Sequence, residues 1–254
     1  MAVITLCSAS GSPGVTTTAV AMALNWPRPV VLIEADPTGG SGVLAGFLRG
    51  TTEYDAGLIE LALSPLDTAD ALREVVRPLA PDVGFVAGVR AHGQVGALRE
   101  VWERLALALA DLDATGQDAI VDAGRLGLVG SPEPLLASSD LTLLLIRGHL
   151  PAIAAARSWS DSVKGPGAGW PRAAALMIGE GQPYRSSEIT NVLDLPVVAA
   201  LPDAPETAAV YHRGAAPPRR FETGAYARAL AAAVGSVRAQ VARNEIALVA
   251  EEAR

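Results

Sequence analysis

The sequence predicts a three-layer α/β/α fold with a doubly wound, mainly parallel sheet, and three observations lead to this fold class. Short apolar runs recur along the chain without polar alternation, so both faces of each strand are expected to be covered. Amphipathic or alanine-rich stretches separate these runs, as in right-handed βαβ units. No repeat or low-complexity linker interrupts the 254 residues. We therefore expect a single domain over residues 1–254.

Each strand is predicted from a short run of aliphatic residues that ends at polar, glycine or proline residues. In chain order the expected strands are residues 2–6, 30–33, 83–87, 119–121, 141–146, 173–178 and 197–201. The helices expected between and after them are residues 16–24, 67–76, 95–112, 151–163, 186–193 and 225–249. The last of these makes up most of a C-terminal helical segment, residues 224–254.

Composition excludes several classes of function. The formal net charge of −7 disfavours a broad nonspecific grip on DNA or anionic lipid, although a local arginine patch could still act. Cys7 is the only cysteine, which excludes an intramolecular disulfide and a cysteine-based zinc cluster. No signal-peptide pattern and no long apolar run is present. We therefore expect a cytoplasmic protein. Lys164 is the only lysine, so every other basic residue is an arginine.

The loop between the first strand and the first helix is the most informative segment. It reads Ser-Ala-Ser-Gly-Ser-Pro-Gly-Val-Thr-Thr-Thr over residues 8–18. In an open α/β sheet such a loop lies at the carboxyl edge of the strands, where ligands bind. A glycine-rich turn that leads into a helix N-terminus offers N–H groups to an anion. The loop alone leaves phosphate binding and a tight structural turn as equal alternatives.

Five segments, in the right order, resemble the ParA/MinD family of deviant Walker A ATPases, and the resemblance covers nearly the whole chain. The family loop K-G-G-x-G-K-T-T is matched by residues 10–17, and the D-x-D-P switch I segment by residues 34–37. The Walker B strand is matched by residues 118–124 and the helix–Ser-Asp–strand segment by residues 135–146. A late Pro-Asp pair and a Gly-x-x-Pro are matched by residues 202–203 and 214–217. The resemblance implies a P-loop NTPase fold of the SIMIBI type.

Both lysines of the family loop are absent from this chain. Ser10 stands where the family has its signature lysine, and Val15 stands where it has the lysine that clamps the β- and γ-phosphates. Losing one such transition-state contact typically lowers a rate by on the order of 10²–10³. Pro13 removes one more N–H donor from the loop. The nucleotide site is therefore expected to be degenerate.

Other parts of the family's site are retained. The resemblance assigns nucleotide contacts to Gly11, Ser12, Gly14, Val15, Thr16 and Thr17. It assigns Mg²⁺ to Thr16, Asp36 and Asp122, with Asp36 as the catalytic carboxylate. Oxygen ligands of this kind suit Mg²⁺, which keeps waters and binds substrate phosphate. The alternative is that Thr16 is an ordinary helix N-terminal residue and that both aspartates cap strand ends.

Three arginines follow expected strand ends and could replace the missing positive charge. They are Arg90, Arg125 and Arg147. Because the carboxyl ends of parallel strands share one edge, these side chains could reach an anion at the loop, and arginine binds phosphate bidentately. Solvent-facing loop arginines are the favoured alternative.

Two surface features concern partners. Arg213, Arg219 and Arg220 form a basic cluster that could contact nucleotide, protein or DNA, although a solvated loop is favoured. Residues 238–254 carry three arginines and three glutamates, without lysines or large aromatic residues. An interfacial membrane anchor normally combines cationic charge with bulky apolar residues. We therefore expect a docking helix or partner surface here and no membrane anchor.

The leading hypothesis is a degenerate member of this family that acts in intracellular positioning or partitioning, or as a regulatory scaffold, with weak or no ATP hydrolysis. It would bind a protein partner or cargo, and the resemblance implies a homodimer. ATP and Mg²⁺ are the implied cofactors. The second hypothesis is an active ATPase that uses Thr16, Asp36, Asp122 and a compensating arginine. The third is an interaction module that binds another anion or no ligand.

Overall fold

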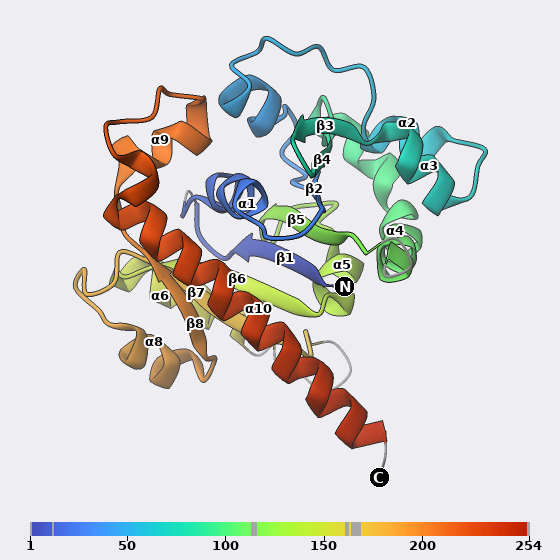
Figure 1. Ribbon diagram of the computed structural model, residues 1–254. Helices are drawn as coiled ribbons and strands as arrows, with labels where there is room; N and C mark the ends of the chain where they lie inside the picture. The colour runs from blue at the N-terminus through green and yellow to red at the C-terminus, as the bar shows by residue number, and fades with distance from the viewer. Residues whose placement is uncertain (1, 12, 113–115, 161–162, 164–168, 253–254) are drawn as a thin grey trace.

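The computed structural model describes residues 2–11, 13–112, 116–160, 163 and 169–252, and Figure 1 shows how they are arranged. These residues form one eight-stranded sheet with the order β3-β4-β2-β5-β1-β6-β7-β8. All neighbouring strands are parallel except β3 and β4, which are antiparallel. The strands are β1 Val3–Ser8, β2 Val30–Glu34, β3 Arg77–Ala80, β4 Val83–Val86, β5 Asp118–Arg125, β6 Leu141–Arg147, β7 Ala173–Ile178 and β8 Val197–Leu201. The expected mainly parallel sheet is confirmed.

Helices cover both faces of this sheet, which gives the three layers expected from the sequence. On one face lie α1 (Val15–Leu24), α9 (Pro205–Arg213) and α10 (Ala225–Glu252). The helices that pack on the other face are α2 Leu58–Leu63, α3 Thr68–Val75, α4 Val101–Ala110, α5 Glu133–Ser138, α6 Leu150–Arg157 and α8 Ser186–Leu193. Among the described helices, none combines the length and apolar character needed to cross a membrane.

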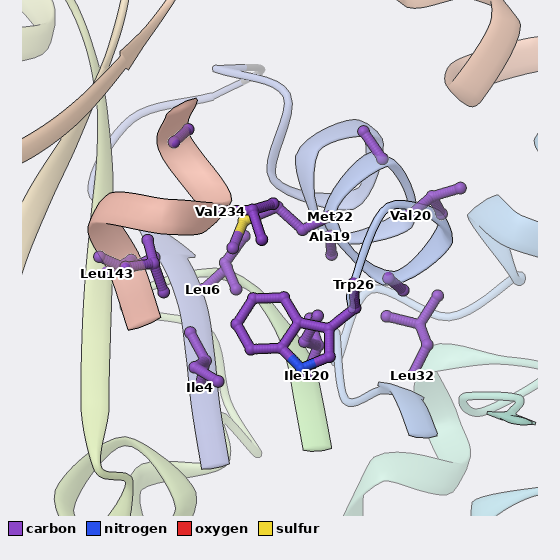
Figure 2. Close-up of a cluster of buried hydrophobic side chains, with 14 of the residues drawn as sticks. Ile4, Leu6, Ala19, Val20, Met22, Trp26, Leu32, Ile120, Leu143 and Val234 are labelled. Carbon is purple, nitrogen blue, oxygen red and sulfur yellow. The ribbon is translucent and has the colours of Figure 1, made fainter. Parts of the chain in front are cut away.

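The central strands are buried on both faces because their side chains alternate between the two helical layers. In β1, Ile4 and Leu6 pack toward α1 and α10, whereas Cys7 packs toward the opposite layer. Figure 2 shows the first of these clusters, with Met22 of α1 and Val234 of α10 above the β1 side chains. Burial in an apolar environment raises the pKa of the Cys7 thiol, as expected for a structural cysteine.

Asp118 anchors the amino end of β5, at the edge of the sheet away from the glycine-rich loop. Its carboxylate is buried and accepts hydrogen bonds from the Ala2 N–H at 2.8 Å and from Trp26 Nε1 at 2.8 Å. Arg28 Nε lies 3.7 Å from the same carboxylate. Thus the first aspartate of the Walker B-like strand is part of the structural core, and only the second, Asp122, lies at the ligand edge.

Several elements differ from the sequence-based expectation. The edge strand β3 was not predicted, because Pro78 argues against a strand except at an edge. The helix expected over residues 95–112 is divided into η2 (His92–Leu98), a 3₁₀ segment, and α4. Two glycines in η2 weaken helix formation there. The helix expected over residues 151–163 is shorter, since α6 ends at Arg157.

Four further segments are helical without having been predicted. They are η1 (Val43–Phe47), a single π-helical turn, the helices α2 and α9, and η4 (Phe221–Thr223), a 3₁₀ turn. The first two are only five and six residues long, so their periodicity is weak. Helix α9 carried a usable signal, because Pro205 occupies its first turn and Gly214 caps its end in a left-handed conformation.

Candidate functional site

The glycine-rich loop connects β1 to α1 at the carboxyl edge of the sheet. Gly14 caps α1 with φ +92°, a left-handed conformation that glycine adopts without the strain of a side chain. The Gly14 carbonyl then accepts the first helical hydrogen bond, from the Thr18 N–H at 2.9 Å. Ser8 Oγ donates to the Ser10 carbonyl at 2.9 Å, which turns the loop back on itself. The loop therefore directs the N-terminus of a ten-residue helix toward the edge where ligands bind.

A pocket of about 570 Å³ opens in front of this helix terminus. Its lining includes most of the residues selected from the sequence, namely Gly11, Gly14, Val15, Thr16, Thr17, Asp36, Arg125 and Arg147. Ser12, which was also selected, lies outside the described residues, as does Lys164. The size and mixed polar and apolar lining are those of a small-molecule site.

The far wall of the pocket was not predicted from the sequence. It consists of the end of β7, the segment after β8, and two helices, and it is lined by Ile178, Pro202, Asp203, Ala204, Pro205, Ala208, His212 and Tyr226. Most of these side chains are apolar, so they could hold a flat, weakly polar group beyond the loop. The available signal was the position of Pro202–Pro205 at a strand end; Tyr226 carried none, because it looks like a core residue.

Val15 changes what the loop can offer to a ligand. Its side chain is only 7% exposed and packs in the core with residues of β1 and α1. The position that carries a lysine in the resembled family is thus filled by a core contact. The loop can still offer backbone N–H groups, but Pro13 contributes none.

Asp122 lies beneath the pocket as a fully buried carboxylic acid. Its Oδ1 accepts a hydrogen bond from the Gly124 N–H at 3.0 Å, whereas its Oδ2 has no hydrogen-bond partner among the described residues. Burial is the largest of the effects that together raise the pKa of Asp122 to about 7, and the neighbouring carboxylates of Glu34 and Asp36 act in the same direction. The Thr16 hydroxyl, which faces this carboxyl, opposes the shift. The structure therefore brings together Thr16, Asp36 and Asp122.

Glu34 is a buried acid, and its place in the D-x-D-P match was the only role that the sequence predicted for it. Its Oε1 accepts from the Val43 N–H at 3.2 Å and its Oε2 from the Gly88 N–H at 3.1 Å. Burial raises the pKa of Glu34, and the hydrogen bonds from the Ser41 hydroxyl and these amides lower it. Through these hydrogen bonds, Glu34 at the end of β2 holds the start of η1 and the segment that follows β4 in place. An acidic residue at the end of an apolar strand was the signal that could have revealed it.

Asp36 is held against the end of β5 by its own turn and by Gly124. Asp36 Oδ1 accepts a hydrogen bond from the Thr38 N–H at 2.8 Å. Gly124 has φ +61°, and a Cβ at this position would lie 2.2 Å from Asp36 Cγ. Only a glycine therefore allows the Asp36 carboxylate to lie directly on the strand that carries Asp122.

The three candidate arginines have different environments. Arg125 is exposed and lines the pocket, and its side chain makes no hydrogen bond or ion pair with the described residues. Arg147 also lines the pocket, but its Nη1 lies 2.5 Å from Asp203 Oδ2. Arg90 does not line this pocket within the described chain. It lies 3.0 Å from Glu60 and over the Tyr54 ring, 4.2 Å from the centroid.

The oxygen donors present fit a magnesium ion that is coordinated partly by the protein and partly by a phosphate. In the described part of the chain, no three His, Cys, Asp or Glu side chains converge as an all-protein metal centre would require. Mg²⁺ does not need such a centre, because it keeps several waters and uses one or two carboxylates. The partnerless Asp122 Oδ2 and the adjacent Thr16 hydroxyl are donors of this type. The loop fits a phosphate less well, because it supplies no cationic side chain.

Comparisons with known proteins place the fold. No protein-family model matches the sequence, and no curated protein matches it either. Solved structures do match over nearly the full length. MinD from Pyrococcus horikoshii in complex with Mg-ADP has 15% identity and a TM-score of 0.69, covering 93% of this chain and 95% of that one.

Two other solved structures agree. A ParA family ATPase from Chlorobium tepidum has 15% identity and a TM-score of 0.69, covering 92% of this chain and 97% of that one. An ATP complex of Cyanothece McdA has 17% identity and a TM-score of 0.68, covering 94% of this chain and 96% of that one. At these identities the likeness shows a shared fold. The ParA/MinD-type P-loop fold expected from the sequence is confirmed.

Proposed function

We propose that this chain is a ParA/MinD-like P-loop protein with a degenerate nucleotide site, acting in intracellular positioning or partitioning or as a regulatory scaffold, with weak or no ATP hydrolysis. One observation carries the proposal. Thr16 and Asp36 line the pocket and the buried Asp122 lies beside them, while the position of the clamping lysine is a valine packed into the core. The residues that frame the site are present. The positive charge of the loop lysines, which would stabilise phosphate in the ground state and in the transition state, is absent.

The expected effect on catalysis follows from electrostatics. In phosphoryl transfer, nearly all of the catalysis comes from positioning and from stabilising charge on the transferred group. Removing one preorganised donor lowers a rate by on the order of 10²–10³, and this loop lacks two lysines and one backbone N–H. Nucleotide can still be held by the remaining loop amides, by the α1 N-terminus and by the apolar far wall. Binding without efficient turnover is therefore the behaviour that we propose.

The proposed role follows from what the structural neighbours are. They include MinD cell division proteins, a MinC:MinD cell division protein complex and a plasmid partition protein. We infer by this likeness that the chain binds a protein partner or cargo. Contact with DNA through Arg213, Arg219 and Arg220 stays a prediction. All three are exposed, at the end of α9 and in the loop that follows it.

The cofactors proposed are ATP and Mg²⁺. The neighbours with Mg-ADP and ATP support this choice. Thr16, Asp36 and Asp122 would hold the ion, directly or through waters, and the loop from Gly11 to Thr17 would contact the phosphates. The bound ion would neutralise phosphate charge, and Arg125 and Arg147 are the arginines that line the pocket in the described part of the chain.

A second candidate is an active ATPase in which arginine compensates for the missing lysines. The observation that favours it is Arg125, an exposed guanidinium at the pocket without a partner among the described residues. Arginine binds phosphate bidentately and stays charged. In this alternative two copies would sandwich the nucleotide, as the resemblance implies. A third candidate, a module that binds no nucleotide, follows if the pocket does not hold ATP.

One experiment separates the two nucleotide-based candidates from the third. One sample of the purified protein is denatured, and any released nucleotide is identified by chromatography. A second, nucleotide-free sample is titrated with ATP in the presence and absence of Mg²⁺. The proposal expects Mg²⁺-dependent binding that Asp122→Asn weakens and Asp118→Asn, on the same strand but at its other end, leaves unchanged. Absence of bound nucleotide together with absence of affinity would reject both nucleotide-based candidates.

A further inference from the structure

Helix α10 has two faces, and only one of them is covered by the rest of the chain. The inward face carries Leu230, Val234, Val237 and Val241, all buried against the sheet and α1. Asn244 Nδ2 then donates to the Asp140 carbonyl at 2.8 Å. Beyond this contact the helix continues to Glu252 and extends past the body of the molecule (Figure 1). The last two turns therefore lie where the chain itself gives them little cover.

The outward face is apolar and follows a regular spacing. Its residues alternate three and four positions apart, as in the seam of a coiled coil, and they are Ala232, Gly235, Ala239, Ala242, Ile246 and Val249. All six are exposed, Ile246 to 71% and Val249 to 67%. A Cβ placed on Gly235 would meet nothing within 4 Å. This seam covers about 27 Å of helix, enough for a helix–helix contact.

The side chains along this seam differ in size between its two halves, and this difference distinguishes parallel from antiparallel packing. The N-terminal half holds only glycine and alanine, whereas the C-terminal half ends in Ile246 and Val249. If two copies packed in parallel, the large residues would meet each other and the small ones would leave a gap. If they packed antiparallel, Ile246 would lie opposite Gly235 of the second copy and Val249 opposite Ala232. Large against small fills the contact at an even spacing.

Charge selects the same orientation. Arg238 and Glu245 lie seven residues apart on one flank of the seam, both exposed, and neither has a hydrogen bond or ion pair within the described residues. The small pocket that Glu245 borders contains no basic side chain. In the antiparallel register that pairs Ile246 with Gly235, each Arg238 faces the Glu245 of the other copy, twice by symmetry. A parallel pairing would instead bring Arg238 against Arg243.

We propose that α10 is a homodimerisation surface, on which a second copy of this chain packs its own α10 antiparallel, with Arg238 facing Glu245 across the contact. This surface lies on the outer face of α10, away from the pocket at the carboxyl edge of the sheet. The dimer therefore requires no nucleotide, and it holds two pockets on separate parts of one assembly. It goes beyond the proposed function and does not depend on it.

The test measures the monomer–dimer equilibrium of the full chain by sedimentation, without nucleotide and with Mg-ATP. The expected result is a reversible dimer whose dissociation constant is the same in both conditions. Arg238→Glu and Glu245→Arg should each weaken the dimer on the order of tenfold or more, because two attractive pairs become repulsive. The double variant that carries both changes should recover wild-type affinity. Arg243→Glu, an equal charge change on the same helix that faces Ser236 in this register, is the matched control.

Orientation is tested separately by disulfide trapping, which does not depend on the charge variants. Cys7 is buried, so it does not interfere. Ala239→Cys and Ala242→Cys proteins should cross-link when they are mixed, because these positions face each other in the antiparallel register. Each protein alone should cross-link poorly. Cross-linking of the unmixed proteins would indicate parallel packing and overturn the proposal.

Three further results would also overturn it. They are a wild-type chain that stays monomeric at hundreds of micromolar, a double variant as weak as the single ones, and a dimer that forms only with Mg-ATP. Vesicles of anionic phospholipid give the remaining arm of the test. If the wild-type chain binds them, loses this binding on Ile246→Ser, and forms no dimer, α10 is a membrane-binding helix and the proposal is wrong.

Discussion

Replacing Asp122 with asparagine should make the protein more stable at alkaline pH, although it removes a residue from the site. Burial raises the pKa of this carboxyl from 3.8 to about 7. The folded protein therefore keeps a proton that the unfolded chain releases, and folding stability falls as the pH rises from about 4 to about 7. Above that range the loss of folding stability has reached its full value and no longer changes with pH. The full shift corresponds to about 4 kcal/mol.

The magnitude that an experiment can reach is smaller, because part of the loss has already occurred at pH 5. Between pH 5 and pH 8 the wild-type chain should lose about 2–3 kcal/mol relative to Asp122→Asn. Asparagine keeps the size of the side chain and its Oδ1 acceptor for the Gly124 N–H. Its amide also supplies donors near Glu34 and Asp36, at the position where Asp122 Oδ2 has no partner among the described residues.

Urea denaturation at several pH values, in the absence of Mg²⁺, measures this difference. Asp118→Asn is the matched control, since it lies on the same strand and is equally buried, but its carboxylate accepts two hydrogen bonds and faces Arg28. It should destabilise the chain by about 1–3 kcal/mol across the range. If the difference between wild type and Asp122→Asn is the same at pH 5 and pH 8, the burial argument for this carboxyl is wrong.

Three other predictions concern the pocket. Gly124→Ala should destabilise the fold by about 1–2 kcal/mol through its left-handed backbone alone, and by more through contact with Asp36. A double-mutant cycle with Asp36→Ala, measured by urea denaturation, should show that Gly124→Ala costs less stability when the Asp36 side chain is absent. Simple additivity of the two changes would contradict the contact. Arg125→Gln should lower pyrophosphate or ATP affinity by about tenfold without changing thermal stability, measured by calorimetry beside the surface control Arg157→Gln; unchanged affinity would make Arg125 an ordinary loop arginine. Val15→Lys should lower stability by about 1–3 kcal/mol, because a core side chain is replaced, yet raise ATP affinity; a destabilised chain with unaltered affinity would mean that the missing charge is not what limits the site.

Much of the fold could be predicted from the sequence because buried parallel strands are apolar throughout. The runs in β1, β2 and β6 are continuous, so their existence followed from composition and periodicity alone. The short elements could not be predicted in this way. Helix α2 and the η1 segment are shorter than two helical turns, so their periodicity is too weak to detect. Strand β3 contains a proline, which is tolerated only in an edge strand. The helix expected over residues 95–112 is divided at η2, where two glycines weaken helix formation.

The site was predictable where it depends on strand ends and not where it depends on packing. Thr16, Asp36 and Asp122 converge because parallel strands place their carboxyl ends at one edge. The same rule suggested Arg90, but Glu60 and Tyr54 hold that side chain elsewhere. The burial of Val15, the roles of Glu34 and Gly124, and the far wall with Tyr226 all depend on contacts between distant segments. A single sequence does not specify such contacts residue by residue.

The most direct test of the central proposal is the rate of ATP hydrolysis by the wild-type chain compared with Asp36→Ala, under saturating Mg-ATP. Both proteins should first be shown to bind nucleotide to the same occupancy, so that a low rate reports the chemical step. The degenerate site predicts that the two rates are indistinguishable. A wild-type rate that clearly exceeds the Asp36→Ala rate would contradict the proposal and establish an active ATPase that works without the loop lysines.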